Sequence, residues 1–321
     1  MMMLRRACTA SLVALALVCA GAARHVALSE ETTPDTAKPP DATKLPDAAK
    51  PPDTAKLPDA KPPNPDCPRS AFRVVVDVGH TVKVPGAMSA RGATEYDFNL
   101  HLAEDIKKAL VDAGFEKTTL LIVAASPPSG LIERAVRANS IPADLFISIH
   151  HDSVPDHLLQ SWDYEGKQNR YNDSYPGYAL FISNDNPDHA GSLLFGKLLG
   201  KALEARGLQY TPHYTLPLMG NRRRILVDAD AGVYRYDQLV VLRATHMPAL
   251  LLEAGSIVNR QEELELATPE RRALTSAAVE SAVEDFCAAH SHNHAVALIK
   301  RPAAPRVAQP ARAVPAPFAR Q

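Results

Sequence analysis

The fold of this chain is decided by residues 72–80, which read FRVVVDVGH. A short apolar run that is rich in β-branched residues and ends at glycine is typical of a buried strand. In an open α/β sheet, functional groups gather at the carboxyl ends of the strands. His80 therefore occupies a position at which a functional site is expected, although a single histidine after a strand is more often a hydrogen-bonded loop residue than a metal ligand.

The residues that follow predict a loop and then a helix. Pro85, Gly86 and Gly92 are turn formers that interrupt any regular element after the strand. Glu95 opens a segment in which apolar residues recur at helical spacing until Gly114. The loop can therefore fold the glutamate back beside the histidine that ends the first strand.

Two further buried strands are predicted to end at residues that can bind a metal or transfer a proton. Residues 145–149 are followed by His150, and residues 249–252 are followed by Glu253. With the first histidine and the glutamate at the helix start, these residues offer two imidazoles and two carboxylates. Two imidazoles and one carboxylate are the ligand set of an open catalytic Zn²⁺ site, whose fourth position holds water. The remaining carboxylate is then available as a general base.

At these positions the chain resembles the zinc-dependent N-acetylmuramoyl-L-alanine amidases, which cut the amide that joins the glycan to the stem peptide of peptidoglycan. The resemblance covers roughly residues 72–288, and its specificity lies in the order of many short motifs, since each alone is weak. These motifs are Asp77-Val78-Gly79-His80, Pro85-Gly86-Ala87, Gly92, Glu95, Arg134, Ala138-Asn139, Ser148-Ile149-His150, Leu242-Arg243, Met247-Pro248-Ala249, Glu253-Ala254-Gly255 and Asn259.

The resemblance implies both a site and an activity. In the family, the first histidine, the first glutamate and the second histidine bind zinc, and the late glutamate is catalytic. Carried over by position, His80, Glu95 and His150 bind one Zn²⁺, and Glu253 is the catalytic base. The implied reaction is hydrolysis of the bond between N-acetylmuramic acid and L-alanine, in cell-wall remodelling or daughter-cell separation.

Two other functions are compatible with part of this pattern. The first is a non-catalytic cell-wall-binding protein on an amidase scaffold, but such a binder has no reason to retain all four site residues. The second is a zinc amidohydrolase that acts on another amide, for which the same site residues would serve equally well. Only the ordered motifs and an export signal favour peptidoglycan as the substrate. A protein activator is left open as a partner, and a net charge of −1 gives no case for nucleic acid.

The predicted fold is a single α/β domain at residues 67–289, with a mixed, twisted sheet of about six strands flanked by helices. The full chain has 321 residues, of which 46% are hydrophobic, and this allows one well-packed core. Strands are expected at residues 74–78, 120–123, 145–149, 179–183, 239–243 and 249–252, and helices at residues 95–113, 131–139, 193–206 and 269–288.

Two segments between these elements carry functional hypotheses. Residues 154–178 are polar and aromatic, and they are interpreted as a substrate-binding rim, with a lid or a plain surface loop as alternatives. Arg222, Arg223 and Arg224 are consecutive. Such a run can meet anionic carboxylates of the substrate, although a solvated basic turn is the commoner outcome.

The ends of the chain have the composition of targeting and linking segments. Residues 1–22, with two arginines, an apolar run and then small residues, predict a signal peptide that exports the mature chain to the periplasm or cell envelope, and the only expected membrane contact is through it. Residues 23–66 repeat a six-residue proline unit and predict a semi-rigid linker. Residues 290–321 lack acidic residues and predict a disordered basic tail.

Two of the four cysteines, Cys8 and Cys19, leave with the predicted signal peptide. The other two, Cys67 and Cys287, bracket the folded region. In an oxidising compartment this placement predicts a disulfide that joins the two ends of the domain, with two independent thiols as the alternative.

Overall fold

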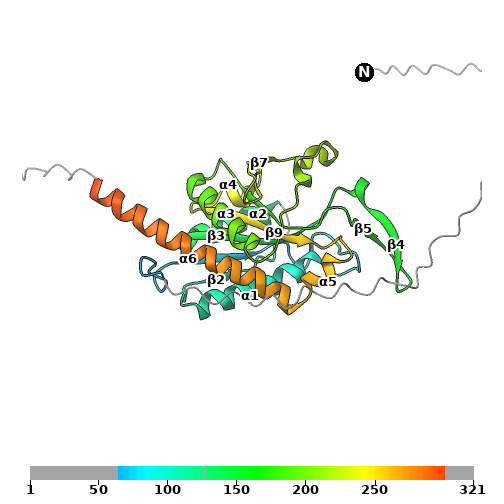
Figure 1. Ribbon diagram of the computed structural model, residues 1–321, viewed down its shortest axis with the longest axis horizontal. Helices are drawn as coiled ribbons and strands as arrows, with labels where there is room; N and C mark the ends of the chain where they lie inside the picture. The colour runs from blue at the N-terminus through cyan, green and yellow to red at the C-terminus, as the bar shows by residue number, and fades with distance from the viewer. Residues whose placement is uncertain (1–63, 126–127, 301–321) are drawn as a thin grey trace, which may run out of the picture. The chain divides into compact units, whose positions relative to one another are not determined.

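The structure is a computed structural model that describes residues 64–125 and 128–300, with only the backbone described for residues 291–300. The predicted signal peptide, residues 23–63 of the predicted linker and residues 301–321 of the predicted tail lie outside the described residues. The described chain forms one seven-stranded sheet with helices on both faces and a separate two-stranded sheet (Figure 1).

The elements follow one another with strands and helices alternating over the first half of the domain. They are β1 Val74–Val78, α1 Glu95–Asp112, β2 Thr119–Leu121, α2 Ser129–Ser140, β3 Leu145–Asp152, η1 Asp156–Leu158, β4 Gln160–Tyr164, β5 Lys167–Tyr171, β6 Ala179–Ile182, α3 His189–Glu204, η2 His213–Thr215, η3 Pro217–Arg222, β7 Ile225–Asp228, β8 Val233–Arg235, α4 Val240–Arg243, β9 Ala249–Ser256, α5 Glu262–Leu266 and α6 Pro269–Lys300. Of these helices, none is both long enough and apolar enough to cross a membrane.

The large sheet is mixed, as predicted, and its strand order is β2-β1-β3-β9-β6-β8-β7. Strands β2, β1, β3 and β9 are mutually parallel, whereas β6 runs antiparallel to β9 and β7 runs antiparallel to β8. Parallel strands have their carboxyl ends at the same edge of the sheet. In the register of the central strands, Val78 lies opposite Ile149 and His150 lies opposite Glu253, so the predicted site residues meet at one edge.

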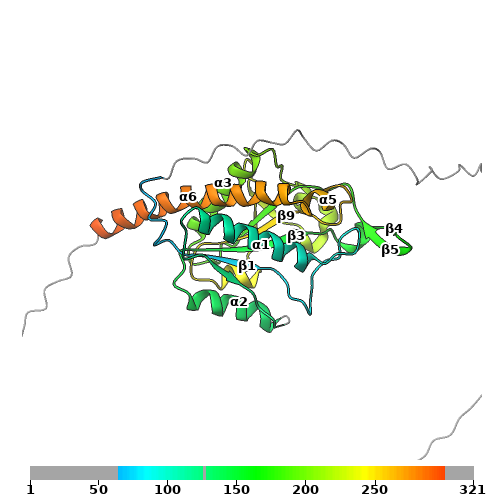
Figure 2. The ribbon, with the colours of Figure 1, turned by 90° about the horizontal axis from the view of Figure 1, so that it is seen from below.

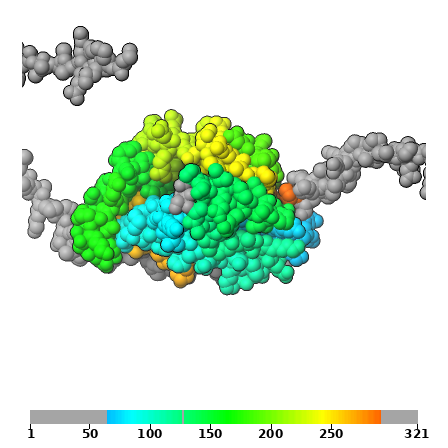
Figure 3. Space-filling view, turned by 180° about the vertical axis from the view of Figure 1, so that it is seen from behind, coloured from blue at the N-terminus to red at the C-terminus, as the bar shows by residue number. Residues whose placement is uncertain are grey.

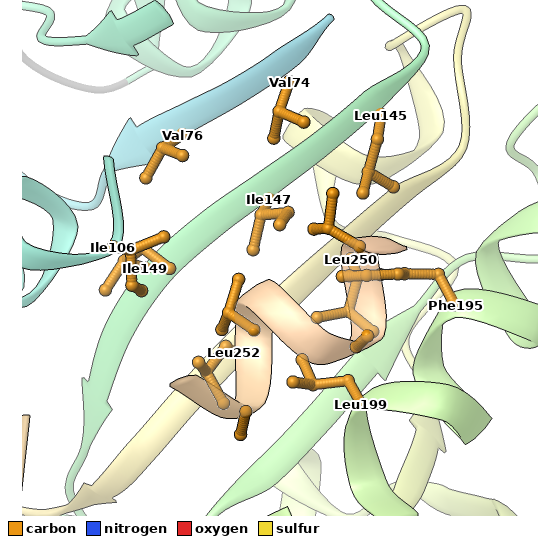
Figure 4. Packing of buried hydrophobic residues seen from close by; sticks show 14 of the residues in the cluster. Val74, Val76, Ile106, Leu145, Ile147, Ile149, Phe195, Leu199, Leu250 and Leu252 are labelled. Atoms are coloured by element: carbon orange, nitrogen blue, oxygen red, sulfur yellow. The ribbon is translucent and has the colours of Figure 1, made fainter. Parts of the chain in front are cut away.

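Helices cover both faces of the sheet, so its central strands are buried on both sides. Helices α1, α3 and α6 lie on one face and α2 lies on the other (Figure 2). On the first face, side chains that alternate along the strands pack with Phe195 and Leu199 of α3 (Figure 4). The intervening residues Val75 and Phe146 belong to the core on the opposite face. This double burial explains why the central strands are nearly continuous apolar runs.

The prediction of a strand at residues 239–243 is wrong, because this segment forms the short helix α4. The Ala244 N–H donates to the Val240 carbonyl at 3.0 Å, and Val241 and Leu242 are buried. A run of only four apolar residues, 239–242, has no periodicity that separates a strand from a buried helical turn. The sheet is completed instead by β7 and β8, which are too short to give a clear pattern in the sequence.

Strands β3 and β9 extend further than predicted. His150 and Glu253 lie within these strands rather than after them, because β3 continues to Asp152 and β9 continues to Ser256. The polar residues remain in the sheet because they pair with each other in register, and Glu253 also pairs with Ala179 of β6. The other predicted strands and helices are present; β1 has the predicted ends, and the ends of the others are shifted.

The last helix is also longer than expected. Helix α6 continues to Lys300, so residues 290–300 of the predicted disordered tail are helical. The sequence explains this difference, since the first proline beyond Pro269 is Pro302 and no glycine intervenes.

The predicted disulfide between Cys67 and Cys287 is present, with a Cα–Cα distance of 5.2 Å. It joins the segment before β1 to helix α6 across 220 residues of sequence. Aromatic packing supports the same junction, since the rings of Phe72 and Phe286 have centroids 6.2 Å apart. The bond therefore ties the start of the domain to the helix that packs against α1 and α3.

Removing this disulfide is expected to destabilise the domain. The double variant Cys67→Ser/Cys287→Ser should lose about 2 to 4 kcal/mol of unfolding free energy, because the unfolded chain regains the entropy that the cross-link removed. Denaturant titration of the two proteins without reductant measures the difference. Reductant should lower the melting temperature of the natural protein and leave that of the double variant unchanged; two freely alkylated thiols in the native, unreduced protein would contradict the assignment.

Candidate metal centre

Three of the predicted site residues, His80, Glu95 and His150, converge at the carboxyl edge of the sheet. One Glu95 carboxylate oxygen lies 3.0 Å from His80 Nε2, and the other lies 2.9 Å from His150 Nδ1. The centroids of the two imidazoles are 4.9 Å apart. Each residue offers a ligand atom, and these atoms all lie within 4.8 Å of one another.

His80 is placed by an unusual backbone conformation at the end of β1. Its φ is 65°, in the left-handed region that non-glycine residues adopt only when their surroundings hold them there. The support comes from Arg134 of α2, which donates to the carbonyls of Val78 and His80. Arg134 also pairs with the buried Asp77 carboxylate, so it fixes the turn that carries the histidine.

Glu95 is placed by the loop that precedes α1. Thr94 caps the helix through its side chain, which accepts a hydrogen bond from the Asp97 N–H. The Glu95 N–H donates to the Ala87 carbonyl at 2.9 Å, and the Ala87 N–H donates to a Glu95 carboxylate oxygen at 3.0 Å. These two bonds fold the loop back on itself, and the glutamate therefore lies beside the first histidine, as predicted.

Two glycines leave the space that this arrangement needs. A Cβ at Gly79 would lie 2.4 Å from His150 Nε2, which no real packing allows. A Cβ at Gly86 would lie 2.4 Å from a Glu95 carboxylate oxygen and 2.7 Å from the His80 ring. Gly86 has a φ of 82°, so its backbone also requires glycine.

The electrostatics of the centre keep Glu95 ionised. Burial raises the pKa of this carboxyl, but the hydrogen bonds and charges of His150 and His80 outweigh burial and hold the pKa well below its usual value. An ionised carboxylate carries no proton that a cation would have to displace. Glu95 is therefore in the state that binds a cation.

The adjacent His151 is turned away from the centre. Its Nδ1 lies 2.8 Å from Asn99 Oδ1, and its ring packs against Phe98 of α1. Burial lowers the pKa of His151 to about 3, so the imidazole remains neutral. Asn99 also donates to Glu95 and to the Gly79 carbonyl, and it therefore links this histidine to the backbone of the centre.

Glu253 lies on β9 opposite His150, outside the cluster of three but next to it. Its Oε2 atom is buried and has no hydrogen-bond partner within the described residues. Burial raises the pKa of Glu253 well above its usual value, and the negative charges of Asp152 and Glu95 raise it further. A carboxyl of this kind can hold a proton near neutral pH, unlike Glu95 in the same site.

The donor set fits a divalent cation of intermediate softness. Two imidazole nitrogens and one carboxylate supply three ligands and leave further coordination positions open, which is typical of catalytic rather than structural sites. The unpartnered oxygen of Glu253 beside this set is consistent with a polar group or water that the site holds during function.

Three further residues beside the centre were not predicted as part of it. Asp152 is 2% exposed and accepts a hydrogen bond from the Tyr214 hydroxyl at 2.6 Å. Arg222 contacts the same carboxylate at 3.4 Å. Burial raises the pKa of Asp152 to about 6, although Arg222 and Tyr214 oppose this shift. Arg222 belongs to the run of three arginines whose sequence pattern suggests a contact for substrate carboxylates, whereas Asp152 and Tyr214 carry no such signal in the sequence.

The segment after β3 contains a regular hairpin, which the sequence did not predict. Strands β4 and β5 pair antiparallel, and they lie beside the loop that follows β1 (Figure 3). The Trp162 indole donates to the Ala90 carbonyl at 2.8 Å, and Arg91 and Arg260 lie over its ring at 5.5 and 5.1 Å. The hairpin is therefore anchored to the loop that holds Glu95; its role as a substrate-binding rim stays a prediction.

Comparison with known proteins places this domain among amidases. The model of the family described as N-acetylmuramoyl-L-alanine amidase matches residues 74–285. No curated protein matches the sequence.

Solved structures of amidases are similar to this domain. The N-acetylmuramyl-L-alanine amidases Ami1 of Mycobacterium smegmatis and of Mycobacterium abscessus are 17% and 19% identical, with TM-scores of 0.51 and 0.51. The match covers 68% and 67% of this chain, and 98% of each of those chains. The N-acetylmuramoyl-L-alanine amidase of Clostridium difficile 630 is 19% identical with a TM-score of 0.50, covering 68% of this chain and 97% of that chain. At such identities the likeness shows a shared fold.

The packing around Gly86 gives a test of the centre with a matched control. Gly86→Ala is expected to weaken divalent cation binding by roughly 10-fold or more, because the added methyl displaces the Glu95 carboxylate and the His80 ring. Gly166 at the hairpin tip has a similar φ of 75° but no atom within 4 Å of an added Cβ. Gly166→Ala therefore carries the same backbone strain without the clash, and it should bind Zn²⁺ like the natural protein in a competition titration. Equal affinities for all three proteins would contradict the assigned geometry.

Proposed function

Because the chain belongs to the N-acetylmuramoyl-L-alanine amidase family, we propose that its amidase activity on peptidoglycan depends on one Zn²⁺ bound by His80, Glu95 and His150. The observation that carries the proposal is the convergence of these three side chains, whose ligand atoms lie within 4.8 Å of one another at the edge of the sheet. A site with three protein ligands keeps a position open for water or substrate. The scissile bond is the amide between N-acetylmuramic acid and L-alanine.

The chemistry divides between the cation and the protein. When bound, Zn²⁺ supplies Lewis-acid polarisation of the lactyl-alanyl carbonyl and a lowered pKa for water. Glu95 and the two histidines hold their positions through the contacts of Asn99, Arg134 and the loop before α1. These contacts leave little freedom to the ligands, so the reacting groups meet in a fixed geometry.

Glu253 is proposed as the general base that becomes the general acid. In its ionised form the carboxylate takes a proton from the attacking water as the water oxygen bonds to the carbonyl carbon, and the resulting carboxylic acid gives this proton to the L-alanine nitrogen as the C–N bond breaks. The environment supports this role, because burial raises the pKa of Glu253 and its Oε2 has no partner within the described residues. Glu95, whose pKa is lowered, is less suited to carry the proton.

The cellular setting follows from the substrate. We propose that the mature chain acts in the periplasm or cell envelope, because peptidoglycan lies there and residues 1–22 have the pattern of a signal peptide. Roles in cell-wall remodelling or daughter-cell separation fit this location. A protein activator stays a prediction from the sequence.

The ligand assignment predicts the metal content of two variants. The mature protein is expected to hold about one Zn²⁺ per chain, and His80→Ala or His150→Ala should lose it, since two remaining donors rarely retain zinc. Elemental analysis after dialysis measures the content. His101→Ala serves as the control, because this exposed histidine lies on α1 outside the cluster. Full zinc occupancy in both ligand variants would contradict the assignment of these histidines as zinc ligands.

The role of Glu253 is tested by measuring zinc and hydrolysis on the same preparation. Glu253→Gln keeps the size of the side chain but removes the proton acceptor, so zinc should stay while hydrolysis of purified sacculi falls by roughly 100-fold or more. Glu116→Gln, at an exposed glutamate, should change neither quantity. Zinc retained with near-normal cleavage would show that the mechanism is wrong, and zinc lost would exchange the roles of Glu253 and Glu95.

A further inference from the structure

The three consecutive arginines at positions 222–224 do not act as one basic patch. The Arg223 Nε donates to the Thr215 carbonyl at 2.9 Å. Arg224 lies over the Tyr236 ring at 3.6 Å and donates to backbone carbonyls of its own turn. Both side chains therefore bind within their own part of the fold, and only Arg222 of the run reaches the edge of the sheet at which the candidate centre lies.

Arg222 is anchored at the end of β3. Its Nη2 donates to the Ser153 carbonyl at 2.6 Å and lies 3.4 Å from Asp152 Oδ1. The Tyr214 hydroxyl donates to the same Asp152 oxygen at 2.6 Å. Since Asp152 is two residues beyond His150 on one strand, these contacts fix the guanidinium close to the centre.

Arg222 nevertheless remains open to solvent. Its side chain is 41% exposed, whereas the Asp152 side chain beneath it is 2% exposed. Arg134, which braces the turn of His80, is by contrast only 4% exposed. A residue that only stabilises the fold needs no exposure to solvent, because all its hydrogen-bond donors face the protein. One guanidinium nitrogen of Arg222 is thus hydrogen-bonded to the protein, while much of the side chain stays accessible to solvent.

The charge of this guanidinium acts on the reacting side of the site. Among the described residues, the charge of Arg222 opposes the rise in the pKa of Glu253, and Arg222 contacts Asp152, two residues from His150 on β3. Guanidinium groups bind carboxylates through paired N–H donors in a fixed plane, which makes arginine suited to recognise an acidic group on a substrate.

We propose that Arg222 binds a carboxylate of the substrate on the peptide side of the scissile amide. This inference rests on the proposed function and names the part of the substrate that the site selects. The lactyl carboxyl of the glycan is consumed in the scissile amide itself, so an anchoring carboxylate must belong to the peptide. Arg222 is therefore a residue that determines specificity for acidic stem peptides, and it takes no part in the bond cleavage.

The experiment compares two soluble substrates with the zinc-loaded mature protein. One is a muramoyl peptide with free peptide carboxylates, and the other is the same compound with each carboxylate converted to a primary amide. The natural protein should have a higher kcat/KM for the acidic compound by roughly 10- to 100-fold, the range expected for a hydrogen bond to a charged group. Arg222→Gln should lose this advantage, mainly through KM, so that its kcat/KM values for the two compounds become about equal.

Two variants complete the test. Arg223→Gln removes one positive charge from the same segment and should keep the preference for the acidic compound. Arg222→Lys keeps the charge without the paired donors and should retain part of the preference, which also covers the case in which the glutamine variant does not fold.

The outcomes separate this inference from the function on which it rests. Equal hydrolysis of both compounds by the natural protein, or an equal loss for both compounds in Arg222→Gln and Arg222→Lys, would overturn the role of Arg222 while leaving the amidase activity intact. A natural protein that binds zinc but cleaves neither compound would overturn the proposed function and this inference with it.

Discussion

The centre depends on one carboxylate that contacts two imidazoles at once. Glu95 lies between His80 and His150, and its two oxygens are 3.0 and 2.9 Å from their nitrogens. This contact needs glycine at position 79 and at position 86, because any larger side chain would occupy the space of the rings or of the carboxylate. Much of the structure near the sheet edge, including the buried Arg134, serves to hold these three groups in place.

The pKa values of two glutamates in the same site are shifted in opposite directions, and their surroundings explain why. Glu95 is buried and Glu253 is partly buried, and the loss of hydration alone would raise both pKa values. Glu95 contacts two imidazoles that stabilise its charge, whereas Glu253 faces the charges of Asp152 and Glu95 and has an oxygen without a partner in the described part of the chain. Pairs of carboxyl groups separated in this way commonly divide the work of catalysis, one remaining ionised and the other exchanging a proton.

The sheet positions the centre, and two segments between its strands surround it. The hairpin β4–β5 is attached through Trp162 to the loop of Glu95, and the segment of η2 and η3 is attached through Tyr214 and Arg222 to Asp152. Both attachments end on residues close to the proposed ligands. The disulfide acts at a distance from them, by tying α6 to the start of β1. The disulfide and the segments that surround the centre thus belong to different parts of the domain.

The sequence by itself determined the central strands, the helix of Glu95 and the grouping of His80 and His150. These follow from local signals: apolar runs ending at polar residues, turn formers between them, and the rule that parallel strands share an edge. The disulfide partners were also predictable, since their positions bracket the domain. Only the tertiary structure decided that residues 240–243 are helical, that residues 160–171 form a hairpin, and that Tyr214 and Arg222 reach Asp152. The helical turn and the hairpin are local, but their short segments have no clear apolar periodicity. The contacts with Asp152 join residues about 60 to 70 positions apart, which no pattern within a short window encodes.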